Sequence, residues 1–325
     1  MAGTNRSARR RHSARGRRKT VATVVGVGLA AVTLTGAGVN RMPGPEVVPE
    51  LLVNQVTEAQ ARATSDRFGI TFLRPTRPGG TYWVSQWDEA RRFSGVDPRD
   101  AWFDADHGSG SFAAEDGQLL ISGETPRMYV HDPRLERQWR DVEVTMYVKR
   151  GEDSGIPYAG FTAVARANHL STEDGPGDSC DTRGYGARLR FDGHADFEKE
   201  TAHPANQAIG DTTVFPGGMP TGVWLGVKYV VLDREDGVHL QLWLDRSDGR
   251  DGGSWTLLRE VVDDGSLLGD TPCAVGVDPA MALTGSPDRE GSESGRPNVS
   301  VYFRSDGIGP DGMAYKWGSI REIAP

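Results

Sequence analysis

From residue 70 onward the sequence alternates between apolar and polar residues in short segments, which clusters of glycine and aspartate separate. Successive side chains of a β-strand point to opposite faces, so this period of two predicts half-buried strands. No segment after residue 70 has the period of a long helix, and no repeat of fixed length argues for a propeller or solenoid. The pattern predicts an all-β domain over residues 70–325, folded as a two-sheet antiparallel β-sandwich or jelly roll. Strands are expected at Asp141–Val148, Tyr185–Phe191, Trp224–Leu232, Val238–Asp245, Asn298–Arg304 and Tyr315–Ile323.

The first 39 residues have the composition of an export signal. Residues 1–19 carry eight Lys or Arg and no acidic residue, and an uncharged stretch rich in Ala, Gly, Val and Thr follows. It leads to the small residues Thr35-Gly36-Ala37, so we predict a secretory signal peptide over residues 1–39. An uncleaved membrane anchor is the alternative, but the weak hydrophobicity of the stretch favours cleavage. We therefore expect an extracellular or cell-envelope protein that makes no membrane contact once the signal is removed.

Residues 40–69 differ from both neighbours. Three prolines within residues 43–49 predict an extended linker, and Val56–Phe68 is expected to form one short helix. The domain that follows is expected to be a monomer.

Removal of the signal makes the remaining chain strongly acidic. The whole sequence has a net charge of −8, and taking away the eight positive charges of residues 1–19 leaves −16. A phosphate backbone repels such a domain, so nucleic acid is not an expected partner.

Two cysteines, Cys180 and Cys273, lie in the part that remains after export. In an oxidising compartment an even count predicts one disulfide between them, with two free buried thiols as the alternative. Their spacing does not fit a zinc site.

A hairpin with one charged face is predicted over residues 184–201. In its first strand Tyr185 and Leu189 share one face, and arginines alternate with them. A three-residue loop, Asp192–His194, places Leu189 opposite Phe197 and gives the two strands matching faces. The other face then carries only charged side chains: Arg188, Arg190, Asp196, Glu198 and Glu200.

The same register sets Arg190 opposite Asp196 and Arg188 opposite Glu198, so ion pairs between the strands are one interpretation of the charged face. Lys199 falls on the apolar side of the second strand. Either a β-bulge redirects Lys199, or it is a partly buried amine with a function.

A second hairpin joins Trp224–Leu232 to Val238–Asp245 through the loop Arg234–Gly237. Matching of the apolar faces sets Lys228 opposite Trp243 and Val230 opposite Gln241. A face with Trp, Lys and Gln suits a sugar, because the ring packs on the indole while polar groups meet the hydroxyls. An ordinary outer sheet face is the alternative.

Three parts of the chain look familiar: Trp224–Val231, Leu240–Asp245 with Trp255, and Tyr315–Ile323. Together they resemble strands of a known superfamily, the concanavalin A-like lectins and glucanases. The resemblance covers roughly residues 100–323 and implies a jelly-roll fold. Its members include laminarinase-like glycosidases, alginate-lyase-like polysaccharide lyases and non-catalytic carbohydrate-binding modules, so it implies a polysaccharide or oligosaccharide partner without choosing an activity.

Laminarinase-like enzymes carry a Glu-x-Asp-x-Glu strand whose outer glutamates are nucleophile and acid/base. This chain has the same alternation with different residues, Asp196-Phe197-Glu198-Lys199-Glu200. Side chains two apart on one strand lie about 6.5–7 Å apart at Cα, which suits a pair of glycosidase carboxylates. The sequence therefore predicts Glu198 and Glu200 as acid/base or nucleophile.

A polysaccharide lyase instead needs cations to neutralise a uronate and a His or Tyr to take its proton. The candidates are His169, His203, Tyr185, Arg188, Arg190 and Lys199. The segment Lys199–His203, with Arg166 and His169 upstream, also looks like secreted microbial proteins of unassigned activity, and Arg166 is a further candidate for substrate binding.

Binding without chemistry is the third interpretation, with Lys228, Gln241 and Trp243 as contact residues. No cofactor is expected; a structural Ca²⁺ held by Asp245, Asp248 and Asp251 is a minor hypothesis, because such Asp/Gly loops are usually only turns. The favoured hypothesis is a secreted jelly-roll protein that cleaves a glycan, as hydrolase or lyase, in the groove of a concave sheet. A non-catalytic, lectin-like protein is the alternative.

Overall fold

The computed structural model describes residues 75–325, apart from residues 108, 153–154, 171–179, 181–182, 268–271, 276 and 286–297. These described residues form two antiparallel sheets, with a 3₁₀ turn at Arg250–Gly252 and no α-helix among them. The predicted all-β, two-sheet sandwich is confirmed, and it is the architecture that the superfamily resemblance implies. The predicted signal peptide, linker and short helix lie outside the described residues.

One sheet has nine strands. Along its hydrogen-bonded order, β15 and β14 lead through β13 and β8 to β17, and β6, β5 and β2 continue the sheet; β1 pairs with β17. Its strands are β1 (Tyr82–Val84), β2 (Arg91–Phe93), β5 (Gly110–Glu115), β6 (Gln118–Gly123), β8 (Val142–Arg150), β13 (Trp224–Arg234), β14 (Gly237–Asp245), β15 (Trp255–Asp263) and β17 (Gly309–Glu322).

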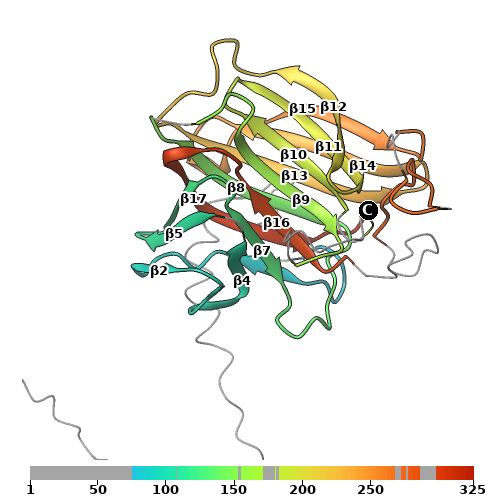
Figure 1. The fold of residues 1–325 in the computed structure, drawn as a ribbon, viewed down its shortest axis with the longest axis horizontal. Coiled ribbons are helices and arrows are strands. Elements are labelled where there is room, and N and C mark those ends of the chain that lie inside the picture. Colours follow the sequence, from blue (N-terminus) through green and yellow to red (C-terminus); the bar gives the residue numbers. More distant parts are fainter. Residues whose placement is uncertain are drawn as a thin grey trace, which may run out of the picture. The chain divides into compact units, whose positions relative to one another are not determined.

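The other sheet has eight strands in the order β12, β11, β10, β9, β16, β7, β4, β3. Figure 1 shows β9, β10 and β11 side by side in this layer, where they carry the predicted charged hairpin. Its strands are β3 (Val96–Asp97), β4 (Asp100–His107), β7 (Arg127–His131), β9 (Gly160–Ala167), β10 (Gly184–Arg190), β11 (His194–Ala202), β12 (Ala205–Thr213) and β16 (Ser300–Arg304).

The hydrophobic core lies between the two sheets. Alternate residues of each strand contribute to it: Val227 and Tyr229 from β13 meet Ala187 and Phe197 from the opposite sheet, all at most 2% exposed. The intervening residues face away from the core, which gives each sheet an outer face. A ligand site is therefore expected on one of these outer faces, because packed side chains fill the interior.

The second hairpin has the predicted register. Lys228 pairs with Trp243 and Val230 pairs with Gln241, and the strands extend until Arg234 pairs with Gly237. Matching of apolar faces, together with the short loop assumed between them, therefore aligned these two strands correctly.

The first hairpin pairs differently from the prediction. Leu189 lies opposite Ala195 rather than Phe197, and Arg188 lies opposite Asp196. The reason is the loop, which turns at Gly193: its N–H donates to the carbonyl of Arg190 (3.0 Å), and its φ is +86°. A shift of two residues keeps every side chain on its predicted face, so the charged outer face remains.

Cys180 and Cys273 form the predicted disulfide, with their Cα atoms 4.9 Å apart. The bond joins residues 93 positions apart, and restricting so long a loop in the unfolded chain is typically worth about 2–4 kcal/mol. Over the described part of the chain, no helix is long and apolar enough to cross a membrane.

Candidate functional site

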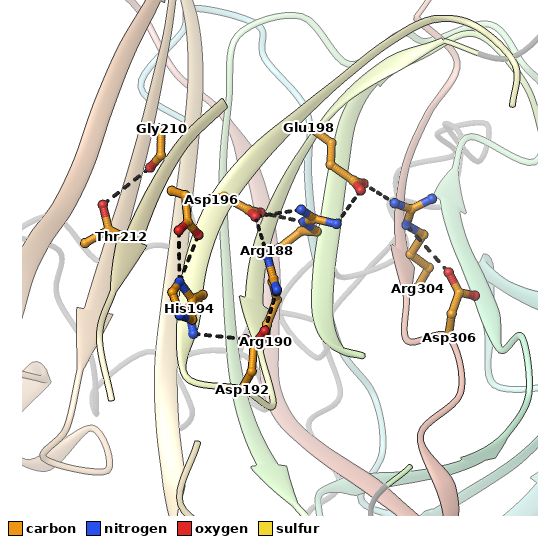
Figure 2. A network of polar contacts seen from close by, with 11 residues as sticks. Arg188, Arg190, Asp192, His194, Asp196, Glu198, Gly210, Thr212, Arg304 and Asp306 are labelled. Atoms are coloured by element: carbon orange, nitrogen blue, oxygen red, sulfur yellow. Dashed lines mark hydrogen bonds and ion pairs between the residues drawn. The ribbon is translucent and has the colours of Figure 1, made fainter. Parts of the chain in front are cut away.

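Charged side chains on the outer face of β10, β11 and β16 form one connected group, which we call the ion-pair network. Figure 2 shows Arg188 between two carboxylates of β11, with Arg304 on the far side of Glu198. Arg188 Nη2 donates to Asp196 Oδ2 at 2.6 Å, and Arg188 Nη1 donates to Glu198 Oε1 at 2.5 Å. Arg190 Nη1 adds a third contact to Asp196 at 3.1 Å. The two strands of the hairpin are thus held together by their own charges.

Both oxygens of Glu198 accept hydrogen bonds from guanidinium groups, one from Arg188 and one from Arg304. Asp196 is fully buried and Glu198 is 6% exposed. Burial alone would lower the pKa of Arg304, but the negative charges around it, Glu198 foremost with Asp306 and Glu200, together outweigh this and raise it. Glu198 is therefore arranged as an ion-pair partner, in agreement with the structural interpretation of the charged face.

Glu200 lies two residues further along β11 and contacts a histidine instead. Its Oε1 is 2.7 Å from His203 Nδ1, and the His203 side chain is 35% exposed. A carboxylate that orients a partly exposed imidazole is a usual arrangement for an acid or base.

The predicted residue His169 follows β9 on the same outer face. Its ring packs edge-on against Tyr129 and Tyr302, with centroids 5.8 and 5.3 Å away, and the three side chains are at most 5% exposed. Burial raises the pKa of Tyr302, so its hydroxyl stays protonated. The cluster packs as an aromatic group against the face.

Three predicted contact residues lie in the interior instead. Arg166 is fully buried, and its Nη2 lies 2.8 Å from Asp141 and 3.1 Å from Asp233. Lys199 and Tyr185 meet at Asp263 of the opposite sheet.

Lys199 Nζ lies 2.6 Å from Asp263 Oδ2 and donates to the carbonyls of Leu267 and Ala280, while the Tyr185 hydroxyl donates to the same carboxylate. Burial lowers the pKa of Lys199, and Asp263 acts against this shift. The amine on the apolar side of β11 is thus buried, and it links the two sheets.

Among the aspartates proposed for calcium, Asp245 accepts hydrogen bonds from the backbone of its own loop. The N–H groups of Ser247, Gly249 and Ser254 donate to its carboxylate at 2.8–2.9 Å. Asp248 pairs with Lys316 at 2.5 Å. Within the described ranges no group of three or more His, Cys, Asp or Glu side chains could hold a metal ion. A structural Ca²⁺ in this loop stays a prediction.

The outer face of the nine-stranded sheet carries a pocket of about 330 Å³. The three contact residues predicted from the second hairpin, Lys228, Gln241 and Trp243, all line it. We call it the Trp243–Trp255 pocket after its two indoles. Its full lining is Thr76, Glu143, Lys228, Val230, Leu232, Arg234, Gln241, Trp243, Trp255, Arg321, Ile323, Ala324 and Pro325.

Polar groups converge on one side of this pocket. Lys228 Nζ lies 4.6 Å from the centre of the Trp255 ring and 3.5 Å from Glu143 Oε1. Arg321 Nη2 lies 2.9 Å from the other oxygen of Glu143. One carboxylate therefore fixes two cations that face the pocket.

The indole of Trp243 is held in place by its own neighbours. Trp243 Nε1 donates to Gln241 Oε1 at 3.2 Å, and Gln241 Nε2 donates to Glu260 at 2.8 Å. The ring also packs with Val230 and Leu232 on the same face. These contacts preorganise an aromatic surface beside polar side chains.

The sequence did not single out Glu143, Arg321 or Arg234 as pocket residues. Strand alternation puts Glu143 and Arg321 on outer faces, but only the pairing of β8 with β17 makes them neighbours. That pairing joins segments far apart in the chain, and no local pattern predicts it.

Comparisons with known proteins found no matching family model and no match among curated proteins. Solved structures with a similar arrangement include a protein of unknown function from Shewanella oneidensis MR-1 (12% identity, 86% of this chain and 96% of that chain, TM-score 0.39). Another is the exoplasmic/lumenal domain of VIP36 (11% identity, 70% of this chain and 85% of that chain, TM-score 0.42). A third is lectin II from Ulex europaeus (11% identity, 73% of this chain and 99% of that chain, TM-score 0.41). Similarities this low carry no argument about function.

Proposed function

We propose that the protein binds a carbohydrate in the Trp243–Trp255 pocket. The observation that carries the proposal is the convergence of two indoles with lysine, arginine and glutamine side chains on one open pocket of about 330 Å³. Ligand pockets of about 300–1,000 Å³ are typically lined by apolar and aromatic groups with a few placed polar groups. A sugar presents an apolar ring face and a rim of hydroxyls, so it matches both parts of this lining.

For this pocket the proposal is that it binds a sugar without cleaving it. Glycosidases ordinarily need two carboxyl side chains on either side of the bond, and the pocket lining has one carboxylate side chain, Glu143. That carboxylate is engaged by Lys228 and Arg321. The lining can hold and orient a sugar, which is the lectin-like alternative of the sequence hypothesis.

The test is a glycan array followed by titration of the best ligand into two variants. Trp243→Ala removes the stacking surface and is expected to weaken binding by about 2 kcal/mol, roughly thirtyfold. Because Trp243 also packs on Val230 and Leu232, Gln241→Ala provides a second variant that leaves those apolar contacts in place.

Leu120→Ala is the matched control, since Leu120 is 38% exposed on β6 of the same sheet and does not line the pocket. Retention of full affinity by both pocket variants would show that the sugar binds elsewhere or not at all.

Cleavage is a second candidate function, favoured by the contact between Glu200 and the partly exposed His203. We propose that this pair acts as acid and base on a glycan that reaches the outer face of β11. Incubation with a polysaccharide library should then release products, and Glu200→Gln and His203→Asn should abolish the release. New reducing ends mark a hydrolase, whereas ultraviolet absorbance of an unsaturated product marks a lyase. If the wild-type protein releases neither, the protein has no cleaving activity on these glycans.

A further inference from the structure

A group of tryptophans and lysines lies beside the pocket on the same outer face. We call Lys149, Trp224, Lys316 and Trp317 the tryptophan–lysine track. Lys316 Nζ lies 4.0 Å from the centre of the Trp317 ring and 4.5 Å from that of Trp224, and Lys149 Nζ lies 4.6 Å from Trp224. Two ammonium groups thus contact one indole. The contacts place positive charge beside aromatic surface, as cation–π geometry requires.

The track lies close to the pocket. Tyr147 joins them: its ring centroid is 5.2 Å from Trp317 and 6.0 Å from Trp255, one of the two pocket indoles. Along β13, Trp224 and Lys228 lie on the same face four residues apart, a rise of about 13 Å. Tyr147 is fully buried, so it connects the indoles of Trp255 and Trp317 through packing and adds no exposed surface between them.

The backbone around Trp317 is arranged unusually. Lys316 and Trp317 are adjacent, so a regular strand would send their side chains to opposite faces. Instead the pairing of β17 with β8 is irregular between Lys316 and Ser319, and Trp317 has a φ of +50°. A bulky residue in this left-handed region is strained by about 1–3 kcal/mol, and such strain concentrates at ligand sites. Here the left-handed backbone at Trp317 places its indole beside the ammonium group of Lys316, so that both side chains belong to the track.

The charge along this surface is locally positive in an acidic chain. Five cations lie on the track and the pocket, against four carboxylates, one of which is Glu260, hydrogen-bonded to Gln241 and His239. Glu143 is engaged by Lys228 and Arg321, Asp248 by Lys316, and Asp245 by its own loop amides. Lys149 has no carboxylate within ion-pair distance anywhere in the described part of the chain. The five cations are Lys149, Lys228, Arg234, Lys316 and Arg321.

We infer that the ligand is an anionic glycan several sugars long, which fills the pocket at one end and lies across the track with its acidic groups against the lysines. The inference rests on the proposed sugar binding in the Trp243–Trp255 pocket and adds to it the charge and the length of the ligand. Indoles fit the ring faces of successive sugars, and the ammonium groups fit their carboxylates or sulfates. Neutral glycans would leave those charges without an added partner.

The test is isothermal titration calorimetry with the whole chain and four probes. They are a dimer and a hexamer of galacturonic acid, a neutral hexamer of glucose, and a sulfated hexasaccharide from heparin. We expect an acidic hexamer to bind about tenfold more tightly than the neutral one, with the advantage falling as salt rises. Preference between the two acidic hexamers identifies carboxylate or sulfate as the group that meets the lysines.

A double variant, Lys149→Gln with Lys316→Gln, isolates the track. It should lose about tenfold in affinity for the acidic hexamer and bind the dimer as the wild type does, because the dimer occupies only the pocket. The matched control is Arg92→Gln with Arg134→Gln, which removes the same charge from two exposed arginines outside the track and pocket.

Equal affinity for neutral and acidic hexamers, or full affinity in the track variant, overturns this inference and leaves the pocket proposal standing. Absence of binding to any array glycan removes the pocket proposal itself, so the two failures are distinct.

Discussion

At the scale of single residues, a buried lysine on β11 forms an ion pair that joins the two sheets. Lys199 is buried on the core side of β11 and its ammonium group lies 2.6 Å from Asp263 of the opposite sheet. Parity along the strand predicted its inward direction, because Lys199 alternates with Glu198 and Glu200. Its partner could not be predicted, since Asp263 lies on the other sheet and 64 positions away in the sequence.

Replacement of Lys199 by Met should destabilise the fold. It leaves the buried carboxylate of Asp263 without its cation, and such losses cost about 3–5 kcal/mol. Guanidinium denaturation of the variant measures the change in the free energy of unfolding. The double variant with Asp263→Asn should recover part of the loss, and a single variant as stable as the wild type would refute the ion pair.

The hydrogen bonds to the Asp245 carboxylate predict that the stability of the fold depends on pH. Burial alone would raise its pKa, but hydrogen bonds from Ser247, Ser254 and Gly249 outweigh this, and the pKa lies below its ordinary value of 3.8. Because the folded-state pKa is depressed, the ionised carboxylate stabilises the fold above the unfolded value, and this contribution is lost as pH falls through the folded pKa.

Asp245→Asn should therefore cost about 2 kcal/mol at neutral pH and flatten the acid side of the stability profile. Thermal melts from pH 2 to 7 record both effects. An unchanged acid slope would mean that another carboxyl group dominates it.

At the scale of elements, the local alternation of apolar and polar residues predicted the two hairpins and the faces of their strands, but the register of only one of them. The strand over 224–234 and its partner were aligned correctly, because matching of their apolar faces was combined with a short loop between them. The first hairpin was displaced by two residues, since its loop depends on a contact with a distant segment. The carbonyl of Gly193 accepts hydrogen bonds from the N–H groups of Val214 and Phe215.

Gly193 tests this explanation directly. Its φ is +86°, and a Cβ there would lie 1.9 Å from the carbonyl oxygen of Phe215. Gly193→Ala should destabilise the fold by more than about 1 kcal/mol. Gly217→Ala is the matched control in the same region, because nothing lies within 4 Å of its added Cβ and no left-handed φ is needed there. Equal denaturation midpoints for the two variants would contradict the account.

The candidate site was predicted only in part. Lys228, Gln241 and Trp243 come from one hairpin, so face matching alone grouped them. Glu143 and Arg321 meet them through pairings of β8 with β13 and β17, which join separate regions of the chain. The carboxylates of β11 were placed on the correct face, but their engagement by Arg304 depends on β16, a strand remote in sequence.

At the scale of the whole molecule, the two outer faces have different characters. One carries an ion-pair network that holds a hairpin and neighbouring strands together. The other carries the Trp243–Trp255 pocket and the tryptophan–lysine track, in which aromatic surface and positive charge are combined. Export through an N-terminal signal and a monomeric domain remain proposals, and both suit a protein that meets glycans outside the cytoplasm.

The most direct test of the central claim is nuclear magnetic resonance of the eight tryptophan side chains during titration with the best array glycan. If the sugar binds as proposed, the indole N–H signals of Trp243 and Trp255 shift in proportion to occupancy. Signals of Trp87 and Trp139, which are buried in the core, stay in place. Binding that leaves the Trp243 and Trp255 signals unmoved would contradict the account.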